Sequence, residues 1–348
     1  MTRAAMARTL GISKPTASQI ASFLLERGFI IEQGVVGRGA VGRRGTMLTL
    51  DGAAVRFLGV RIDVSHCTVF CSNALAVLPE PCGTFATPTA YPAFLAALCS
   101  ALAAVRSRLG VPPLACILSI PGMCNDATGE VFLCPNLHML DTRSVRSDLA
   151  SRLGIPVIQI QEVRALALGA LEVHPVMKTF FCLDIAQGVG GASVIDNVLY
   201  HGRFHAAGEI GHTPVEGGER PCGCGRCGCL ETIAGSAGLL RSAAERFGST
   251  GPARTFEEYA RSNPGKAEEL FLDVIPPLAR ALAGAAAVLD PDHLVVHGAV
   301  WDLCPRALPL LRSLTGSTVP LIAVRGARRR GMVRHAFHES ILLPLKEL

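Results

Sequence analysis

The chain has 348 residues, of which 49% are hydrophobic and 18% charged, so it can bury ordinary cores, and extended disorder is excluded. No uninterrupted apolar run reaches the ~18 residues of a spanning helix, and no apolar segment follows the charges near the N-terminus, which argues against a secretory signal. We therefore expect a soluble, cytoplasmic protein whose 13 cysteines do not form a disulfide framework.

The net charge of +5 lies entirely in the first 50 residues. This segment holds seven Lys or Arg and two acids, so residues 51–348 are neutral overall. A short basic segment joined to a neutral body is typical of a nucleic-acid-binding module attached to a sensor or an enzyme.

The first 50 residues also predict a winged helix-turn-helix. Residues 2–10 and 14–27 have helical apolar spacing, and residues 11–13 between them form a turn with an N-cap serine. Residues 29–32 and 46–50 are expected to be short strands joined by a Gly- and Arg-rich wing. Base edges and phosphates would meet small, polar or basic side chains of the second helix and the wing. These candidates are Lys14, Thr16, Ser18, Gln19, Arg38, Arg43 and Arg44.

Two alternatives to a working DNA module stay open. A helical hairpin with solvated arginines has the same spacing, because the helix-turn-helix pattern alone is not specific. A winged helix also normally has a helix before the one that begins here at Thr2. Either the start therefore lies upstream of Met1, or the module is incomplete.

The rest of the chain predicts two successive sets of alternating strands and helices. The expected strands are residues 57–64, 67–71, 114–120, 156–160, 179–185, 192–195 and 293–297. The expected helices are residues 92–109, 163–171, 230–247 and 268–288. Such alternation indicates an α/β protein of two lobes with a cleft between them.

The most informative motif lies within residues 208–231. Cys222, Cys224 and Cys229 have C-x-C-x4-C spacing, and the first of them follows His212 by ten residues. Three thiolates and one imidazole are the ligand set of a closed, tetrahedral zinc site, and interleaved glycines let so short a loop fold tightly. The motif therefore predicts a structural zinc ion.

Glu209 and Glu231 flank this metal motif. A loop clamped by a metal can hold both carboxylates towards one bound molecule, which would link the metal to a polar ligand pocket. Alternatively, each is an ordinary solvated acid. Cys227 is an additional thiol in the loop, and we expect it not to bind the metal.

The chain resembles the family known as ROK, which unites bacterial sugar-responsive repressors, open reading frames and sugar kinases. Residues 208–231 fit the family signature at every diagnostic position, and the resemblance covers almost the whole chain. Supporting matches are Pro121-Gly122, Cys134-Pro-Asn136, Tyr200-His-Gly202 and Leu289-Asp-Pro291. The resemblance implies two actin-like, ribonuclease-H-like lobes that close on a hexose, here preceded by the winged helix-turn-helix.

The resemblance also implies roles for individual residues. Zinc positions are taken by His212, Cys222, Cys224 and Cys229. Sugar-contacting positions are taken by Asn136, Gln161, Glu162, Glu209, His212 and Glu231. The implied domains are residues 1–52 for DNA binding, 53–165 for the first lobe, and 166–348 for the second lobe with the zinc loop, whose last helix is a candidate to pack back on the first lobe.

The nucleotide-binding elements of a kinase of this family are weakened in this chain. Residues 61–65 (Arg-Ile-Asp-Val-Ser) replace Asp-x-Gly-Gly-Thr, without the glycines that let backbone amides approach a triphosphate. Ala186-Gln187 stands where Gly-Thr is usual, and His297-Gly298-Ala299 replaces a glycine-rich turn. Gln161-Glu162 replaces an Asn-Asp pair, so the carboxylate at the general-base position is displaced by about one bond length, which is costly where geometry dominates.

These changes favour a sugar-responsive transcriptional regulator, a repressor rather than an enzyme. The expected partners are operator DNA, a sugar or sugar-phosphate effector and structural Zn²⁺, and the expected assembly is a homodimer or homotetramer. The alternatives are a kinase that phosphorylates a hexose or N-acetylhexosamine with ATP, and a degenerate protein that binds neither DNA nor sugar. The arginines of residues 325–330 are expected to lie in a solvated loop.

Overall fold

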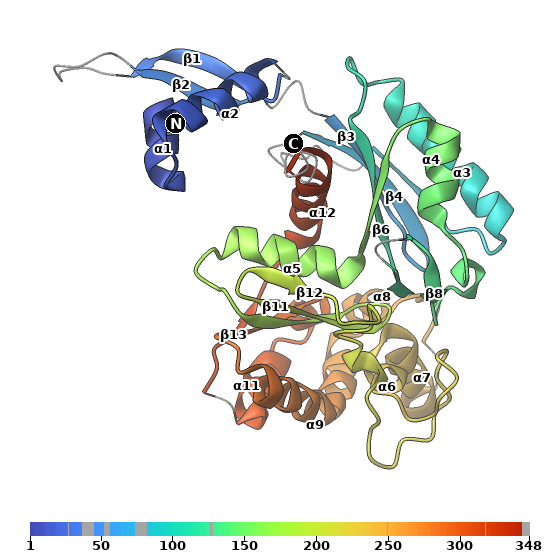
Figure 1. Cartoon of the computed structure of the whole chain (residues 1–348). Helices are drawn as coiled ribbons and strands as arrows, with labels where there is room; N and C mark the ends of the chain where they lie inside the picture. The colour runs from blue at the N-terminus through green and yellow to red at the C-terminus, as the bar shows by residue number, and fades with distance from the viewer. Residues whose placement is uncertain are drawn as a thin grey trace.

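The computed structural model contains an N-terminal module followed by two lobes, each built on a five-stranded sheet (Figure 1). It describes the whole chain except residues 27, 37–44, 52–55, 74–81, 126–127, 249, 317 and 343–348. Figure 1 shows the N-terminal module beside the first lobe and the end of α12 (Ala327–Phe337).

The N-terminal module consists of two helices and a hairpin. Its elements are α1 (Arg3–Leu10), α2 (Lys14–Glu26), β1 (Ile30–Val36) and β2 (Gly45–Leu50). The Thr2 hydroxyl caps α1 by accepting from the Ala5 amide at 3.2 Å, and Gly11 ends the helix in the left-handed conformation at φ 64°. Both expected helices and both expected strands are therefore present. Its small core consists of Met6, Ala7, Ala17, Ala21, Ile30 and Leu48.

The first lobe is a sheet with strand order β5-β4-β3-β6-β9. Its strands are β3 (Arg56–Arg61), β4 (His66–Asn73), β5 (Gly83–Ala86), β6 (Ala115–Ile120) and β9 (Val157–Gln161). The parallel strands β3, β6 and β9 form its centre, and every residue of β6 is buried because helices cover both faces. α3 (Tyr91–Arg106) and α4 (Val145–Leu153) pack on one face, and α12 packs on the other.

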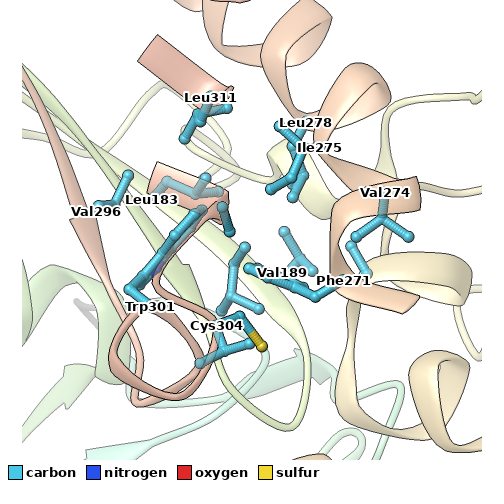
Figure 2. Close-up of a cluster of buried hydrophobic side chains, with 14 of the residues drawn as sticks. Leu183, Val189, Phe271, Val274, Ile275, Leu278, Val296, Trp301, Cys304 and Leu311 are labelled. Atoms are coloured by element: carbon cyan, nitrogen blue, oxygen red, sulfur yellow. The ribbon is translucent and has the colours of Figure 1, made fainter. Parts of the chain in front are cut away.

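The second lobe is a sheet with strand order β12-β11-β10-β13-β14. Its strands are β10 (Phe180–Ile185), β11 (Val189–Ile195), β12 (Val198–Tyr200), β13 (His293–His297) and β14 (Leu321–Ala323). Its helices are α5 (Glu162–Val173), α6 (Glu231–Ala234), α7 (Ser236–Phe247), α8 (Phe256–Ser262), α9 (Pro264–Leu289), α10 (Val300–Leu303) and α11 (Ala307–Thr315). Figure 2 shows the core between this sheet and α9, where Leu183 and Val189 face Phe271 and Trp301.

One predicted helix is interrupted. Residues 230–247 form two helices, α6 and α7, because Gly235 between them is extended at φ −75° and ψ 161°. The amide of Ser236 then donates to the carbonyl of Gln187 at 3.1 Å instead of continuing the helix. This contact anchors the start of α7 on the loop that precedes β11.

Helix α9 is the one helix among the described residues that is long and apolar enough to cross a membrane. One side of it is buried in the core of the second lobe, where Leu270, Phe271, Ile275 and Leu278 lie. A long core helix meets the same criteria of length and composition. Its apolar sequence is explained by this packing.

Helices α5 and α12 cross at very short range. A Cβ atom placed on Gly331 would lie 1.7 Å from the carbonyl oxygen of Ala165, and one placed on Gly169 would lie 1.9 Å from that of Ala327. Only glycine fits at these two positions, so the helices form one closely packed pair.

The prediction that the arginines of residues 325–330 lie in a solvated loop is wrong for Arg328. This residue belongs to the first turn of α12, and its exposed fraction is only 9%. Two carboxylates from distant parts of the chain hold it inside, as described below. Arg329 and Arg330 also belong to α12 rather than to a loop, but their side chains and that of Arg325 are exposed, as expected.

Candidate functional site

The two lobes enclose a cleft at the carboxyl ends of β6, β9 and β10. This is where open α/β sheets usually bind ligands, and the polar lining suits a small polar molecule. All six residues with a predicted sugar-contacting role line the cleft, and they are Asn136, Gln161, Glu162, Glu209, His212 and Glu231.

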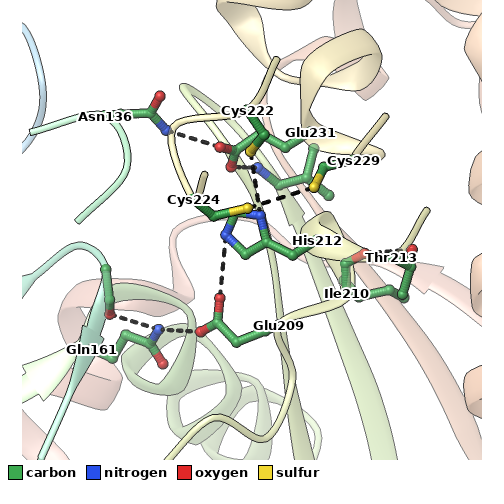
Figure 3. Close-up of polar contacts among 12 residues, drawn as sticks. Asn136, Gln161, Glu209, Ile210, His212, Thr213, Cys222, Cys224, Cys229 and Glu231 are labelled. Atoms are coloured by element: carbon green, nitrogen blue, oxygen red, sulfur yellow. Dashed lines mark hydrogen bonds and ion pairs between the residues drawn. The ribbon is translucent and has the colours of Figure 1, made fainter. Parts of the chain in front are cut away.

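Gln161 joins the first lobe to Glu209 of the second. Its Nε2 donates to the carbonyl of Gly122 at 2.9 Å and to Oε1 of Glu209 at 3.2 Å (Figure 3). Its Oε1 is buried and has no hydrogen-bond partner in the part of the chain that the structure describes. A buried acceptor of this kind costs free energy unless a ligand donor satisfies it, so the position suits a hydroxyl group.

Glu231 is held at the opposite side of the cleft by two donors. Its Oε2 accepts from the backbone amide of Val189 at 2.9 Å, and its Oε1 accepts from Nδ2 of Asn136 at 3.2 Å. Val189 begins β11 and Asn136 belongs to the first lobe, so this carboxylate also spans both lobes. Burial is the main cause that raises the pKa of the neighbouring carboxyl group, Glu209.

The metal motif forms a compact cluster beside the cleft. His212 and three cysteines place one ligand atom each within 4.8 Å of one another. The Sγ of Cys222 lies 3.6 Å from Nδ1 of His212, and the Sγ atoms of Cys224 and Cys229 also lie 3.6 Å apart. Tetrahedral zinc with Zn–S bonds of about 2.3 Å would separate two sulfurs by about 3.8 Å. The donor set and its spacing therefore fit zinc.

Cys227 does not belong to this group of four and is exposed on the loop. The metal loop also touches the first lobe. A Cβ atom on Gly223 would lie 2.4 Å from the carbonyl oxygen of Pro135, so only glycine permits this approach. Because Pro135 precedes Asn136, the loop packs directly beside one of the residues that line the cleft.

At the inner end of the cleft, Arg328 makes ion pairs with two carboxylates. Its guanidinium is 3.4 Å from Oε1 of Glu162 and also binds Asp184, which in turn lies 2.7 Å from Nδ1 of His297. Burial raises the pKa of Glu162 to about 7 although Arg328 opposes this shift. Burial would also raise the pKa of Asp184, but Arg328 and His297 hold it below its usual value.

The segment expected to replace the first phosphate loop of a kinase is also charged. Arg61 and Asp63 are 4.0 Å apart, and Oδ1 of Asp63 and Nε of Arg61 are buried without hydrogen-bond partners among the described residues. The contacts of Arg328 could not be predicted from the sequence, since 144 residues separate it from Asp184. Val189 was likewise missed as a site residue because it contributes only its backbone amide.

The predicted DNA-binding residues fall into two groups. Lys14, Thr16, Ser18 and Gln19 are exposed along the first two turns of α2, whose start is capped by the Ser13 hydroxyl accepting from the Thr16 amide at 3.2 Å. The wing residues Arg38, Arg43 and Arg44 lie outside the described residues.

Comparison with known proteins gives one family. Residues 86–320 match the ROK family. A xylose repressor from Caldicellulosiruptor bescii is 26% identical over 247 residues, which are 69% of this chain and 61% of that protein. An N-acetyl-D-glucosamine kinase from Pasteurella multocida is 29% identical over 241 residues, which are 63% of this chain and 78% of the kinase. The chain thus aligns with about three fifths of the repressor's length.

Two solved structures have the same fold. A ROK family transcriptional regulator, described as a homologue of the E. coli MLC protein, superposes with a TM-score of 0.80 at 18% identity, covering 99% of this chain and 94% of the regulator. A ROK family glucokinase from Streptomyces griseus, in complex with glucose and AMPPNP, gives a TM-score of 0.69 at 24% identity and covers 81% of this chain and 98% of the kinase. The regulator match extends over the N-terminal module.

Proposed function

Because this chain belongs to the ROK family, whose described members include repressors and sugar kinases, we propose that it is a sugar-responsive transcriptional regulator that binds DNA as a repressor. The observation that carries this proposal is the combination of an intact polar cleft with the N-terminal module in one chain. An enzyme that only phosphorylates a sugar has no use for such a module.

The effector in this proposal is a sugar or sugar phosphate bound between the lobes. Two hydrogen bonds cross the cleft, from Gln161 to Glu209 and from Asn136 to Glu231. Sugar hydroxyls both donate and accept, so a sugar can replace each direct contact by one that passes through the ligand. The proposed sugar contacts are Asn136, Gln161, Glu162, Glu209, His212 and Glu231.

The proposal includes a structural zinc ion held by His212, Cys222, Cys224 and Cys229. Zinc would supply no reaction step; it would keep the loop folded and fix the ring of His212 beside the cleft. Residues 1–52 would bind operator DNA, and residues 53–165 and 166–348 would be the two effector-binding lobes. We further propose a cytoplasmic homodimer or homotetramer, because paired modules bind the paired half-sites of an operator.

A sugar kinase is the second candidate, favoured by the named kinases among the relatives. Against it stands the pairing of Arg328 with Glu162, the carboxylate at the general-base position. Arg328 would have to release Glu162 before that carboxylate could approach and accept a proton from a sugar hydroxyl. Arg61 also stands where such a kinase needs an acid near its metal ion.

One experiment separates the two candidates. The full chain is titrated calorimetrically with xylose, glucose and N-acetyl-D-glucosamine, with and without Mg-ATP, and ATP turnover is measured in parallel. A regulator should bind one of these sugars or a related one without ATP and give no turnover, whereas sugar-dependent turnover would establish the kinase.

Selection from a random DNA duplex library, followed by a mobility shift with and without the sugar, tests the DNA-binding part of the proposal.

A further inference from the structure

Arg328 connects the two lobes at the inner end of the cleft. Glu162 follows β9 of the first sheet, and Asp184 lies near the end of β10 in the second sheet. One guanidinium binds both carboxylates, and its exposed fraction is 9%. A buried charge that loses one partner is strongly destabilised, so the position of Arg328 depends on how the two lobes sit around it.

A movement of Arg328 can be transmitted along α12 to a region outside the cleft, because α12 cannot slide on α5. The close approaches of Gly331 to Ala165 and of Gly169 to Ala327 leave no room for a side chain between the two helices. Packed helices of this kind move as a unit rather than deform. A displacement of Arg328 must therefore displace the rest of α12.

The other half of α12 contributes side chains to a buried cluster that the N-terminal module also contacts. Met332, Val333 and Ala336 share a buried cluster with residues of the first sheet, and Phe29 packs against this cluster. Phe29 immediately precedes β1, and its backbone is hydrogen-bonded on both sides. Its amide donates to the carbonyl of Leu24 at 2.9 Å, and its carbonyl accepts from the amide of Asp51 at 2.9 Å.

We propose that α12 couples the cleft to the DNA-binding module, with Arg328 as the positioning residue at one end and the contact of Phe29 at the other. The inference rests on the proposed function, since it assigns the path by which a sugar would alter DNA affinity. A ligand that hydrogen-bonds Glu162 or changes the lobe separation alters the pairing of Arg328. That change shifts α12 and with it the surface on which Phe29 rests.

Hydrogen–deuterium exchange on the full chain tests the coupling without any ligand. The first variant is Arg328→Gln, and its matched control is Arg329→Gln, because Arg329 is the exposed neighbour on the same turn. Coupling predicts that Arg328→Gln speeds exchange of the amides in β1 and β2 by about tenfold or more, while the control leaves them unchanged. Acceleration confined to α5, α12 and β10 would overturn the proposal.

A second variant tests the coupling from the opposite end. Phe29→Ala should speed exchange at the start of α5 and the end of β10, since coupling between two sites is reciprocal. If Arg328→Gln accelerates every region, it has unfolded the chain, and Phe29→Ala then decides alone: unchanged exchange around the cleft overturns the proposal.

The link to function has its own readout. Phe29→Ala should still bind the effector sugar, yet the sugar should no longer alter exchange in β1 and β2. A sugar response that persists in Phe29→Ala contradicts the coupling path. If the unmodified chain binds no sugar or no DNA, the proposed function fails instead, and the two exchange experiments still report on the coupling.

Discussion

The Nε2 atom of His212 lies 3.7 Å from Oε2 of Glu209, while Nδ1 of the same ring lies 3.6 Å from Sγ of Cys222. One imidazole therefore contacts the metal cluster with one nitrogen and a carboxylate of the cleft with the other. In zinc sites the second nitrogen of a ligating histidine usually meets such a partner, which fixes the tautomer and the ring orientation. Glu209 in turn accepts from Gln161, so metal binding and the shape of the cleft are linked through these contacts.

Cys224→Ser should abolish stoichiometric zinc binding, because the site would lose one of four ligands. Thermal unfolding should then begin about 5 °C lower or more, and sugar affinity should fall because His212 loses its anchor. Elemental analysis and a thermal melt measure both effects. Cys227→Ser is the matched control, since that thiol is exposed and lies outside the cluster. Equal zinc content in the two variants would refute the assigned ligand set.

Glu231→Gln should weaken sugar binding by about tenfold or more, which corresponds to roughly 1.4 kcal/mol. The amide replaces an acceptor by a donor at a position where Val189 and Asn136 already donate. Calorimetric titration with the effector sugar measures the loss. Glu216→Gln, at an exposed position of the same loop, should leave affinity unchanged. If Glu231→Gln binds the sugar with unchanged affinity, Glu231 does not contact the sugar.

The stability of the chain should fall as pH rises from about 4.5 to 7. Burial raises the pKa of Glu162 from its usual 4.5 to about 7, so in this window the native state holds a proton that the unfolded state has lost. The free energy of unfolding then decreases by up to about 3 kcal/mol across the window. Asp184 contributes nothing there, because its pKa is lowered and its effect lies at more acidic pH.

Glu162→Gln should flatten this pH dependence, because glutamine cannot take up the proton. Urea denaturation between pH 4.5 and 8 measures the slope. Glu172→Gln is the control, because Glu172 lies on the same helix and pairs with Arg330 at 3.9 Å near the surface. An unchanged slope in Glu162→Gln would mean that another group takes up the proton.

Gly331→Ala should destabilise the chain by about 1–3 kcal/mol, since its methyl group would overlap the carbonyl of Ala165. Gly284→Ala in α9 is a control for which the opposite change in stability is expected. Apart from its chain neighbours and the backbone of its own helix, no described atom lies within 4 Å of a Cβ at Gly284, so alanine there should stabilise the helix by up to about 1 kcal/mol. Chemical denaturation of both variants measures the contrast, and similar values for the two would argue against the close crossing of α5 and α12.

Lys14→Gln should weaken binding to the selected DNA duplex and reduce the slope of log K against log salt by about one. Lys14 is exposed at the start of α2, where a phosphate contact is expected. A fluorescence anisotropy titration at several salt concentrations gives the slope. Arg241→Gln, on the exposed side of α7 in the second lobe, should bind DNA like the unmodified chain. Identical slopes for all three proteins would exclude Lys14 from the interface.

Local features of the sequence predicted the parts of the fold that depend on near neighbours. Apolar spacing located α1, α2, β6, β9 and β13 to within a few residues. The metal cluster was predictable for the same reason, because His212 and Cys229 are close in the sequence and the loop needs only its glycines to close. The break at Gly235 was missed, since its cause is the contact of Ser236 with Gln187 in another segment.

The charged end of the cleft could not be predicted in this way. Arg328 stands in a run of arginines that resembles a surface loop by composition, and the carboxylates that bury it come from β10 and α5. Its burial follows from the crossing of α5 and α12, which depends on two glycines 162 positions apart in the sequence, Gly169 and Gly331. No periodicity in either segment marks that crossing.

The packing of α12 on the first sheet has a consequence for biosynthesis. The ribosome makes the first-sheet residues early, among them Phe57, Phe70 and Ile117. The α12 residues that cover them are translated only after the whole second lobe, and these are Met332, Val333 and Ala336. During translation one side of the early sheet thus stays uncovered and open to chaperones or to misfolding. A nonsense mutation shortly before residue 327 would leave this apolar surface permanently bare, so such a truncated product should be cleared by proteolysis even though both sheets are encoded in full.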